Sequence, residues 1–263
     1  MRIVRLVSLA IFAVVAGLAG AAAQDREIQQ AAATPELSAR ACLADLDRQV
    51  ADAKADLARC STAIAATGLP VAERAGAFLV RAKAHAALSD AAAARADYQQ
   101  AVQLFTAAID PTAANPTLVF YRAVAYHALG DVEHAEKDYD FVIVNNPRNA
   151  VALVDRAILL SRLKGEVITA GADFDQAVAA APNDADVRMA RAEFQYLRGQ
   201  FNLAAADYDA VLKLDPSRPL ALYGRGRARL HLGDTANGNA DLAAARALDA
   251  GVDRAFTAAG LKP

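Results

Sequence analysis

Apolar residues recur every three or four positions in pairs of short stretches between about residue 71 and residue 250. This spacing is typical of amphipathic helices, and stretches this short need tertiary packing to be stable. A glycine or a serine separates the two stretches of each pair, and a proline follows most pairs. The pattern therefore predicts helical hairpins, each made of a helix, a tight turn, a second helix and a break.

The hairpins repeat at a nearly constant distance. The turn glycines Gly130, Gly165, Gly199 and Gly233 follow one another with a period in the mid-thirties. A fixed period in this range indicates a solenoid, in which each unit packs on its neighbours instead of around one central core. We therefore expect an all-α fold.

Particular residue types keep their place in every unit. A small residue occurs once in each first helix and once in each second helix, where a larger side chain would force the helices apart: Ala82, Ala123, Ala157, Ala192 and Gly226, then Ala94, Ala135, Ala170, Ala204 and Gly238. An aromatic residue follows on the second helix, at Tyr98, Tyr139, Phe174 and Tyr208, with Leu242 in the last unit.

This combination resembles the tetratricopeptide repeat family over about residues 76–250, or five units. Within that family it is similar to a bacterial variant with Arg-Ala or Arg-Gly on the first helix and Asp-Tyr on the second. The resemblance implies a right-handed superhelical solenoid of helix-turn-helix repeats. It also implies a broad role in binding other proteins.

The sequence divides into four parts. Residues 1–23 read as a signal peptide, because Arg2 and Arg5 precede an apolar run and small residues end at Ala23. We expect cleavage after Ala23 and export to the periplasm; an uncleaved anchor is the alternative. The other parts are a divergent helical hairpin cap at 24–70, the repeat array at 71–250 and a closing segment at 251–263. The units of the array are 71–108, 116–147, 148–182, 183–216 and 217–250.

Three units depart from the period. Seven extra residues lie between the turn positions Ser89 and Gly130, and we expect a loop or a lengthened helix end at 109–116. The third unit has one extra residue between Arg156 and Gly165. In the last unit, residues 237–239 are expected to interrupt the second helix, and 252–259 to form a short closing helix.

Arginine and aspartate lie at equal distances from each turn, so they should face each other within a hairpin. Their separation along the chain is the same in four units and one position longer in the third. The pairs are Arg81 with Asp97, Arg122 with Asp138, Arg156 with Asp173, Arg191 with Asp207 and Arg225 with Asp241. We expect partly buried ion pairs; the alternative is a row of arginines that lines a ligand groove.

The two cysteines, Cys42 and Cys60, both lie in the predicted cap before the array. On one unbroken helix, which rises ~1.5 Å per residue, they would be about 27 Å apart, too far for a disulfide. They meet only if the chain reverses near Ala51, where Asp45, Asp47 or Asp52 would cap the next helix. Export permits a disulfide, and two free buried thiols are the alternative.

Composition and charge exclude several classes of function. The chain has 28 basic and 30 acidic residues, a net charge of −2, and no basic stripe, which argues against nucleic acid. The four histidines lack ligand spacing, so we expect no metal. No phosphate-binding loop or nucleophile elbow is present, so we expect no cofactor and no catalytic residue. After Gln24 no apolar run is long enough to span a membrane.

The concave face remains as the place for a partner, because the resemblance implies that first helices line it. The matching positions are Lys83, Phe120, His127, Met189, Glu193, Tyr196, Tyr223, Arg227 and His231. These residues would hold a peptide with a few apolar anchors, or they form an ordinary half-buried helix face. We expect a non-catalytic scaffold that binds a protein or peptide. The alternatives are a binder of a small ligand or peptidoglycan fragment, and an accessory subunit ordered only within a larger complex.

Overall fold

The computed structural model describes residues 40–44, 46 and 52–261, and every regular element in these ranges is helical. The predicted signal peptide, its cleavage point and the predicted reversal near Ala51 lie outside the described residues, as do Asp45 and Asp47. Within the described ranges, no helix combines the length and the apolar character that crossing a membrane requires.

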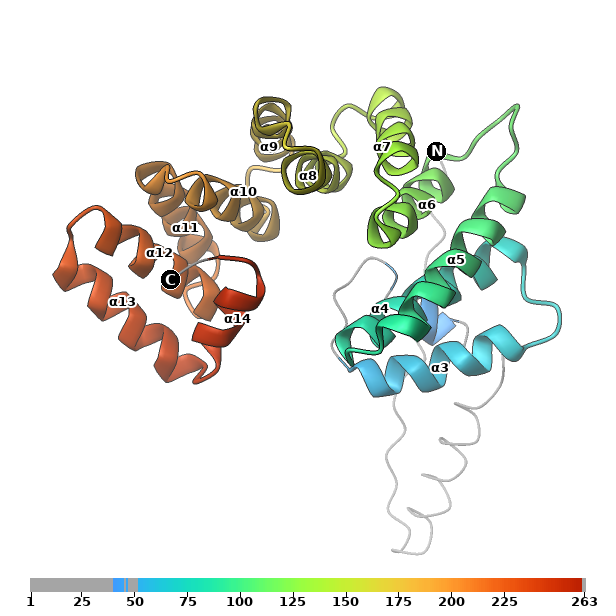
Figure 1. The fold of residues 1–263 in the computed structure, drawn as a ribbon, viewed down its shortest axis with the longest axis horizontal. Helices are drawn as coiled ribbons and strands as arrows, with labels where there is room; N and C mark the ends of the chain where they lie inside the picture. The colour runs from blue at the N-terminus through green and yellow to red at the C-terminus, as the bar shows by residue number, and fades with distance from the viewer. Residues whose placement is uncertain (1–39, 45, 47–51, 262–263) are drawn as a thin grey trace, which may run out of the picture.

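The helices form an arch of five hairpins (Figure 1). A separate helix, α3 (Ala53–Ala65), precedes the hairpins and packs against the first of them, and α14 (Val252–Ala258) follows the last. The hairpins are α4 (Val71–Ala87) with α5 (Ala91–Ala108), α6 (Pro116–Leu129) with α7 (Val132–Asn145), α8 (Ala150–Leu159) with α9 (Val167–Ala180), α10 (Ala185–Leu197) with α11 (Phe201–Leu214), and α12 (Pro219–His231) with α13 (Thr235–Leu248). The prediction of an all-α solenoid is confirmed.

Each hairpin turns at a residue in the left-handed backbone region. Gly130 has φ of 77°, and the other turn glycines lie between 69° and 84°. Ser89 adopts the same conformation, at 63°, without being glycine. An aspartate then caps most of the second helices; Asp131, for example, accepts the backbone N–H of His134. The turn therefore ends one helix and starts the next within two or three residues.

Small residues allow the two helices of a hairpin to approach closely. All of the predicted small positions are buried. In the last hairpin, a Cβ added to Gly226 would lie 2.9 Å from the carbonyl oxygen of Gly238. The predicted interruption at residues 237–239 is wrong, since α13 runs through them unbroken. Packing against α12 keeps this weak helical sequence in the helix.

The irregular units keep the solenoid intact. Helix α5 has 18 residues, whereas the second helices of the other hairpins have 14. The seven extra residues thus give both a lengthened helix and a loop, 109–115. The single extra residue of the third unit is contained in a π-helix, Leu160–Lys164, which follows α8 directly.

A disulfide joins the segment before α3 to α3 itself. Cys42 and Cys60 are bonded, with their Cα atoms 5.1 Å apart, and both residues are fully buried. Asp52 caps α3 by accepting the N–H of Ala55. The structure therefore has a bonded pair and not the alternative of two free thiols.

Candidate functional site

Each of the five arginine and aspartate pairs forms an ion pair within its hairpin. The arginine Nε and Nη2 donate to the two carboxylate oxygens over 2.6 to 2.8 Å in every unit. The aspartate side chains are at most 10% exposed. Hydrogen bonding to Asp138 raises the pKa of Arg122. These arginines therefore hold the hairpins together as ion pairs, and Arg122 also lines a cavity.

A second set of aspartates joins neighbouring units. The Nη1 of Arg156 donates to Asp140 over 2.7 Å, across the boundary between two hairpins. The same contact joins Arg191 to Asp175 at 2.9 Å and Arg225 to Asp209 at 2.6 Å, and the spacing along the chain is the same in all three pairs. The sequence analysis did not predict these aspartates. Each of them stands 16 residues before its arginine, and a search at that separation would have found them.

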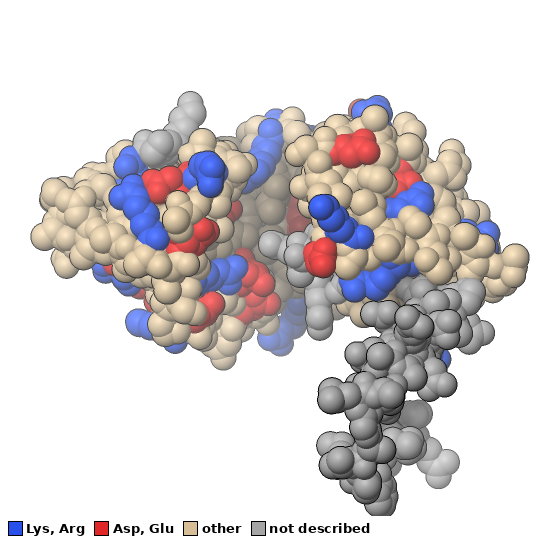
Figure 2. All heavy atoms as spheres, turned by 90° about the horizontal axis from the view of Figure 1, so that it is seen from below, with Lys and Arg blue, Asp and Glu red and all other residues tan. Residues whose placement is uncertain are grey.

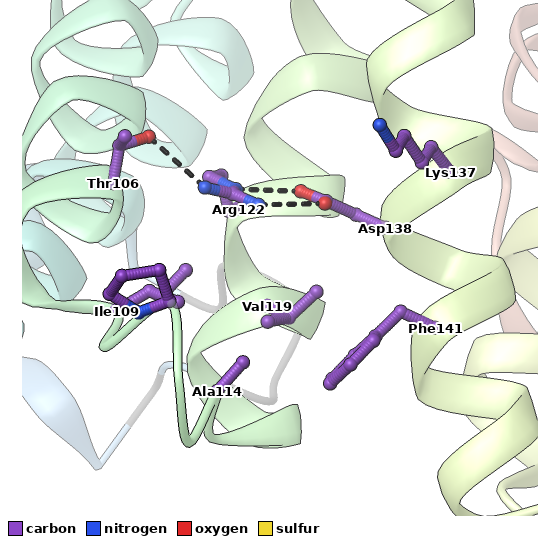
Figure 3. A pocket seen from close by; sticks show the side chains of 9 residues that line it. Thr106, Ile109, Ala114, Val119, Arg122, Lys137, Asp138 and Phe141 are labelled. Atoms are coloured by element: carbon purple, nitrogen blue, oxygen red, sulfur yellow. Dashed lines mark hydrogen bonds and ion pairs between the residues drawn. The ribbon is translucent and has the colours of Figure 1, made fainter.

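The first junction between hairpins differs from the later ones. Thr106 stands at the equivalent spacing before Arg122, and its hydroxyl is 3.3 Å from the Nη1 of that arginine. A cavity of about 410 Å³ opens beside this contact, with Ile109 and Val119 on one side and Phe141 facing them (Figure 3). None of the nine predicted groove residues lines it.

Three of the predicted groove residues are buried in the core. Met189 and Tyr196 are each 5% exposed, and Tyr223 is 3% exposed. The expectation that these side chains are accessible on the concave face is wrong. For Tyr196 and Tyr223 the physical reason is α14, whose Phe256 packs against both rings, and Met189 belongs to the same core cluster.

Helix α14 lies on the inner side of the arch at its C-terminal foot (Figure 1). Val252 and Phe256 are fully buried. The ring of Phe256 contacts the rings of Tyr196 and Tyr223, with centroids 5.4 and 4.8 Å apart. The predicted closing helix is therefore present, but it occupies the face that was predicted to be open.

On α4 and α6, the predicted groove residues already have partners in the chain. Lys83 is half-buried and donates to the carbonyl of Leu46 over 2.7 Å. Phe120 is half-buried, with its ring 6.1 Å from that of Tyr139. His127 has its Nδ1 3.5 Å from the Tyr139 hydroxyl, and burial lowers the pKa of this imidazole. This part of the inner face is mainly packed structure.

The remaining three residues, on α10 and α12, are more open to a partner. Burial raises the pKa of Glu193, which is half-buried. The buried Nε of Arg227 has no hydrogen-bond partner among the described residues. His231 is exposed and stacks on Phe201 at 4.1 Å. These three side chains are therefore less enclosed than Met189, Tyr196 and Tyr223.

Asp155 on α8 is a further titratable group, which the sequence pattern did not single out. Burial raises the pKa of its carboxyl to about 7, and the nearby charge of Lys83 opposes this shift. No hydrogen bond or ion pair reaches this carboxyl from the described residues. Its charge therefore changes near neutral pH.

The molecule viewed from below is hollowed between two lobes, and basic and acidic side chains alternate on this face (Figure 2). Such mixing does not make a continuous basic path for a nucleic-acid backbone. Within the described ranges, no group of three or more histidine, cysteine, aspartate or glutamate residues could hold a metal ion. The face is suited to a ligand with both apolar and charged groups.

No protein-family model and no curated protein matches this chain. Several solved structures are similar in fold. The crystal structure of MamA has a TM-score of 0.54 and 15% identity, over 66% of this chain and 96% of that one. A MamA RS-1 double mutant has a TM-score of 0.52 and 20% identity, over 65% and 96% of the two chains. A tetratricopeptide repeat protein from Parabacteroides merdae covers 85% of this chain at 19% identity, with a TM-score of 0.49. The fold is the tetratricopeptide repeat solenoid.

Proposed function

We propose that this tetratricopeptide solenoid is a non-catalytic scaffold that binds a protein or peptide partner on its inner face. We further propose that it works in a bacterial periplasm. The N-terminal charged and apolar pattern supports export, and the bonded Cys42 and Cys60 suit an oxidising compartment.

The observation that carries the binding function is a difference between two kinds of position. Packing positions hold the same residue types in every unit: a small residue, a paired arginine and a paired aspartate. Two residues after each paired arginine, at positions that the family resemblance assigns to the concave face, the side chain differs in every unit: Lys83, Val124, Ile158, Glu193 and Arg227. Helix packing requires uniformity, so the variable face is the one available for recognition.

The chemistry of this face favours a peptide with apolar and charged groups. Ile158 and Glu193 are half-buried and lie on neighbouring first helices, α8 and α10. The buried Nε of Arg227 has no hydrogen-bond partner among the described residues, and a carboxylate or carbonyl that reached it would satisfy this donor. A helical or extended segment laid along the first helices would contact all three residues.

A small ligand or peptidoglycan fragment would need a narrow pocket with converging polar groups. The 410 Å³ cavity does not meet this need on the inner face, because it lies at the junction of the first two hairpins and has largely apolar walls. We therefore favour a protein or peptide partner.

Site-specific photo-crosslinking tests this proposal. A crosslinking residue in place of Glu193 should capture one defined partner from the periplasmic fraction. The matched control replaces Ile168 on α9, which is 88% exposed, and should capture none. The same preparation gives the mature N-terminus by mass spectrometry, which should be Gln24. The same crosslinked products from both positions would contradict binding at the inner face.

A further inference from the structure

Helix α14 does not continue the solenoid. Apart from its own hairpin partner, each first helix from α6 to α12 packs chiefly against the second helix of the preceding hairpin. In contrast, α14 packs more against α12 than against α13. The chain therefore turns inward after Asp249 and leaves the stacking direction of the array.

The docked segment binds through three apolar side chains. Val252, Phe256 and Leu261 are at most 1% exposed and belong to the same core cluster as Tyr196 and Tyr223. Phe256 fills the space between these two tyrosine rings. The inner face thus has a site for one aromatic side chain and a second site for an aliphatic side chain five residues later.

Polar contacts of α14 surround this apolar centre. The Tyr223 hydroxyl donates to Asp253 over 2.8 Å, and Arg246 donates to both oxygens of the same carboxylate. Arg162 donates to the carbonyl of Ala259 over 3.3 Å. The Arg246 and Asp253 side chains are 50% and 43% exposed, so their ion pair contributes little to docking.

The segment can separate from the array without disturbing the hairpins. Helix α14 has seven residues, too few to be stable alone in water, and it joins α13 through 249–251. Among the contacts of the described residues, none of the five paired arginines binds to it. Undocking would therefore leave the hairpins and their ion pairs in place and expose Tyr196 and Tyr223.

The docked segment leaves one donor of the site unused, because the buried Nε of Arg227 has no hydrogen-bond partner among the described residues. Arg227 is close enough to Tyr223 for its charge to oppose the rise in the pKa of that hydroxyl. A ligand with an additional carboxylate near Arg227 would gain an ion pair that α14 does not make.

From these contacts we propose that residues 252–261 are a displaceable internal ligand of the inner face, and that the partner presents a short helix of the same chemistry. That helix carries an aromatic residue and a carboxylate three residues before it, and an aliphatic residue follows five residues after the aromatic one, beyond a turn like that at Gly260. A second carboxylate that reaches Arg227 lets the partner displace α14. This inference rests on the proposed binding function and specifies its ligand and its regulation.

A peptide competition experiment tests the inference. The probe is a fluorescent peptide of residues 250–261, added to the full chain and followed by anisotropy. The variant Phe256→Ala with Leu261→Ala should bind it saturably. The wild-type chain should bind at least tenfold more weakly, because its own segment competes at high effective concentration. A probe with Phe256→Ala should lose binding.

A second variant covers the case in which the first does not fold. Asp253→Lys keeps all three apolar side chains, removes the acceptor of the Tyr223 hydroxyl and places a positive charge beside Arg246, so it should bind the probe more tightly than wild type. The inference is overturned if a cooperatively melting variant binds the probe no better than wild type. It is also overturned if the wild-type chain is a dimer that exchanges α14 between copies. Specific crosslinking at Glu193 would survive either failure, which separates this inference from the proposed function.

Discussion

Asp140 accepts a hydrogen bond from the Nη1 of Arg156 over 2.7 Å, although the two residues belong to different hairpins. The same arginine holds Asp173 of its own hairpin through Nε and Nη2. One guanidinium group therefore fixes both the closure of a unit and its stacking on the previous unit. The contact within the hairpin is the more buried, since the Asp173 side chain is 4% exposed and that of Asp140 is 51% exposed.

The two kinds of contact should differ in their contribution to stability. Asp138→Ala leaves the charge of Arg122 partly buried without its partner, and we expect the free energy of unfolding to fall by about 3 kcal/mol. Asp140→Ala removes the exposed carboxylate that accepts from Arg156 of the next hairpin. It should lower the free energy of unfolding by less than about 1 kcal/mol. Urea unfolding of both variants measures the difference. Equal losses would show that the pair within the hairpin is not the stronger contact.

The first junction lacks the aspartate that the later junctions have. Thr106→Asp would place a carboxylate where Arg122 now has a hydroxyl 3.3 Å away. We expect a gain in stability of about 0.5 kcal/mol, because the added ion pair is exposed. Thr106→Asn is the matched control, because asparagine has the shape of aspartate but no charge. It should give a smaller gain in stability. The gain should shrink at high salt; a gain that does not depend on salt would exclude this explanation.

Two glycines test how closely the helices pack. A Cβ on Gly224 would lie 2.3 Å from the ring of Tyr208, which is fully buried, so Gly224→Ala should destabilise the chain by about 2 kcal/mol. A Cβ on Gly171 would meet Phe194 at 3.6 Å, an ordinary contact. Gly171→Ala should therefore stabilise α9 by about 0.5 kcal/mol through helix propensity. Thermal melts of both variants should shift in opposite directions, and shifts of the same sign would refute the packing argument.

The disulfide should stabilise the N-terminal end of the array. Cys42 and Cys60 close a loop with a sequence separation of 18, for which the loss of unfolded-state entropy contributes about 3 kcal/mol. Replacing both with serine should lower the melting temperature, and a reductant should lower that of the wild type alone. If the reductant lowers the melting temperature of both proteins equally, the effect does not come from this bond.

Stability should depend on pH through Asp155. Because burial raises its pKa to about 7, the native chain keeps a proton that the unfolded chain loses near pH 4. The free energy of unfolding therefore falls as the pH rises from about 4 to 7, and this contribution is constant above that range. Asp155→Asn should raise the free energy of unfolding by on the order of 2 kcal/mol at pH 8 and leave it almost unchanged at pH 4. The same difference in melting temperature at both pH values would contradict this prediction.

Local signals were sufficient to predict the hairpins and their ion pairs. Turn glycines such as Gly130 and the equal distances of Arg122 and Asp138 from the turn depend on only one hairpin. The unbroken helix α13 was not predictable in this way. Its Asn and Gly residues disfavour a helix locally, and close packing of Gly238 against α12 outweighs that preference.

The inward turn of α14 was beyond local signals for a related reason. An apolar segment after the last hairpin has the same sequence pattern whether it covers the end of the array or its inner face. The choice depends on the contacts of Phe256 with Tyr196 and Tyr223, which belong to the first helices of the last two hairpins. Periodicity within one unit contains no information about such contacts.

The seven extra residues at the first junction correspond to almost two full turns of an α-helix. For this reason Thr106 falls on the helix face that Gln99 would occupy without the insertion, and it still meets Arg122. Thr106 lies about 10 Å further along α5 than Gln99, so the second hairpin meets α5 nearer its C-terminal end. The same junction holds the cavity beside Phe141, so an insertion of this length keeps the contact face of the helix and opens space between two hairpins.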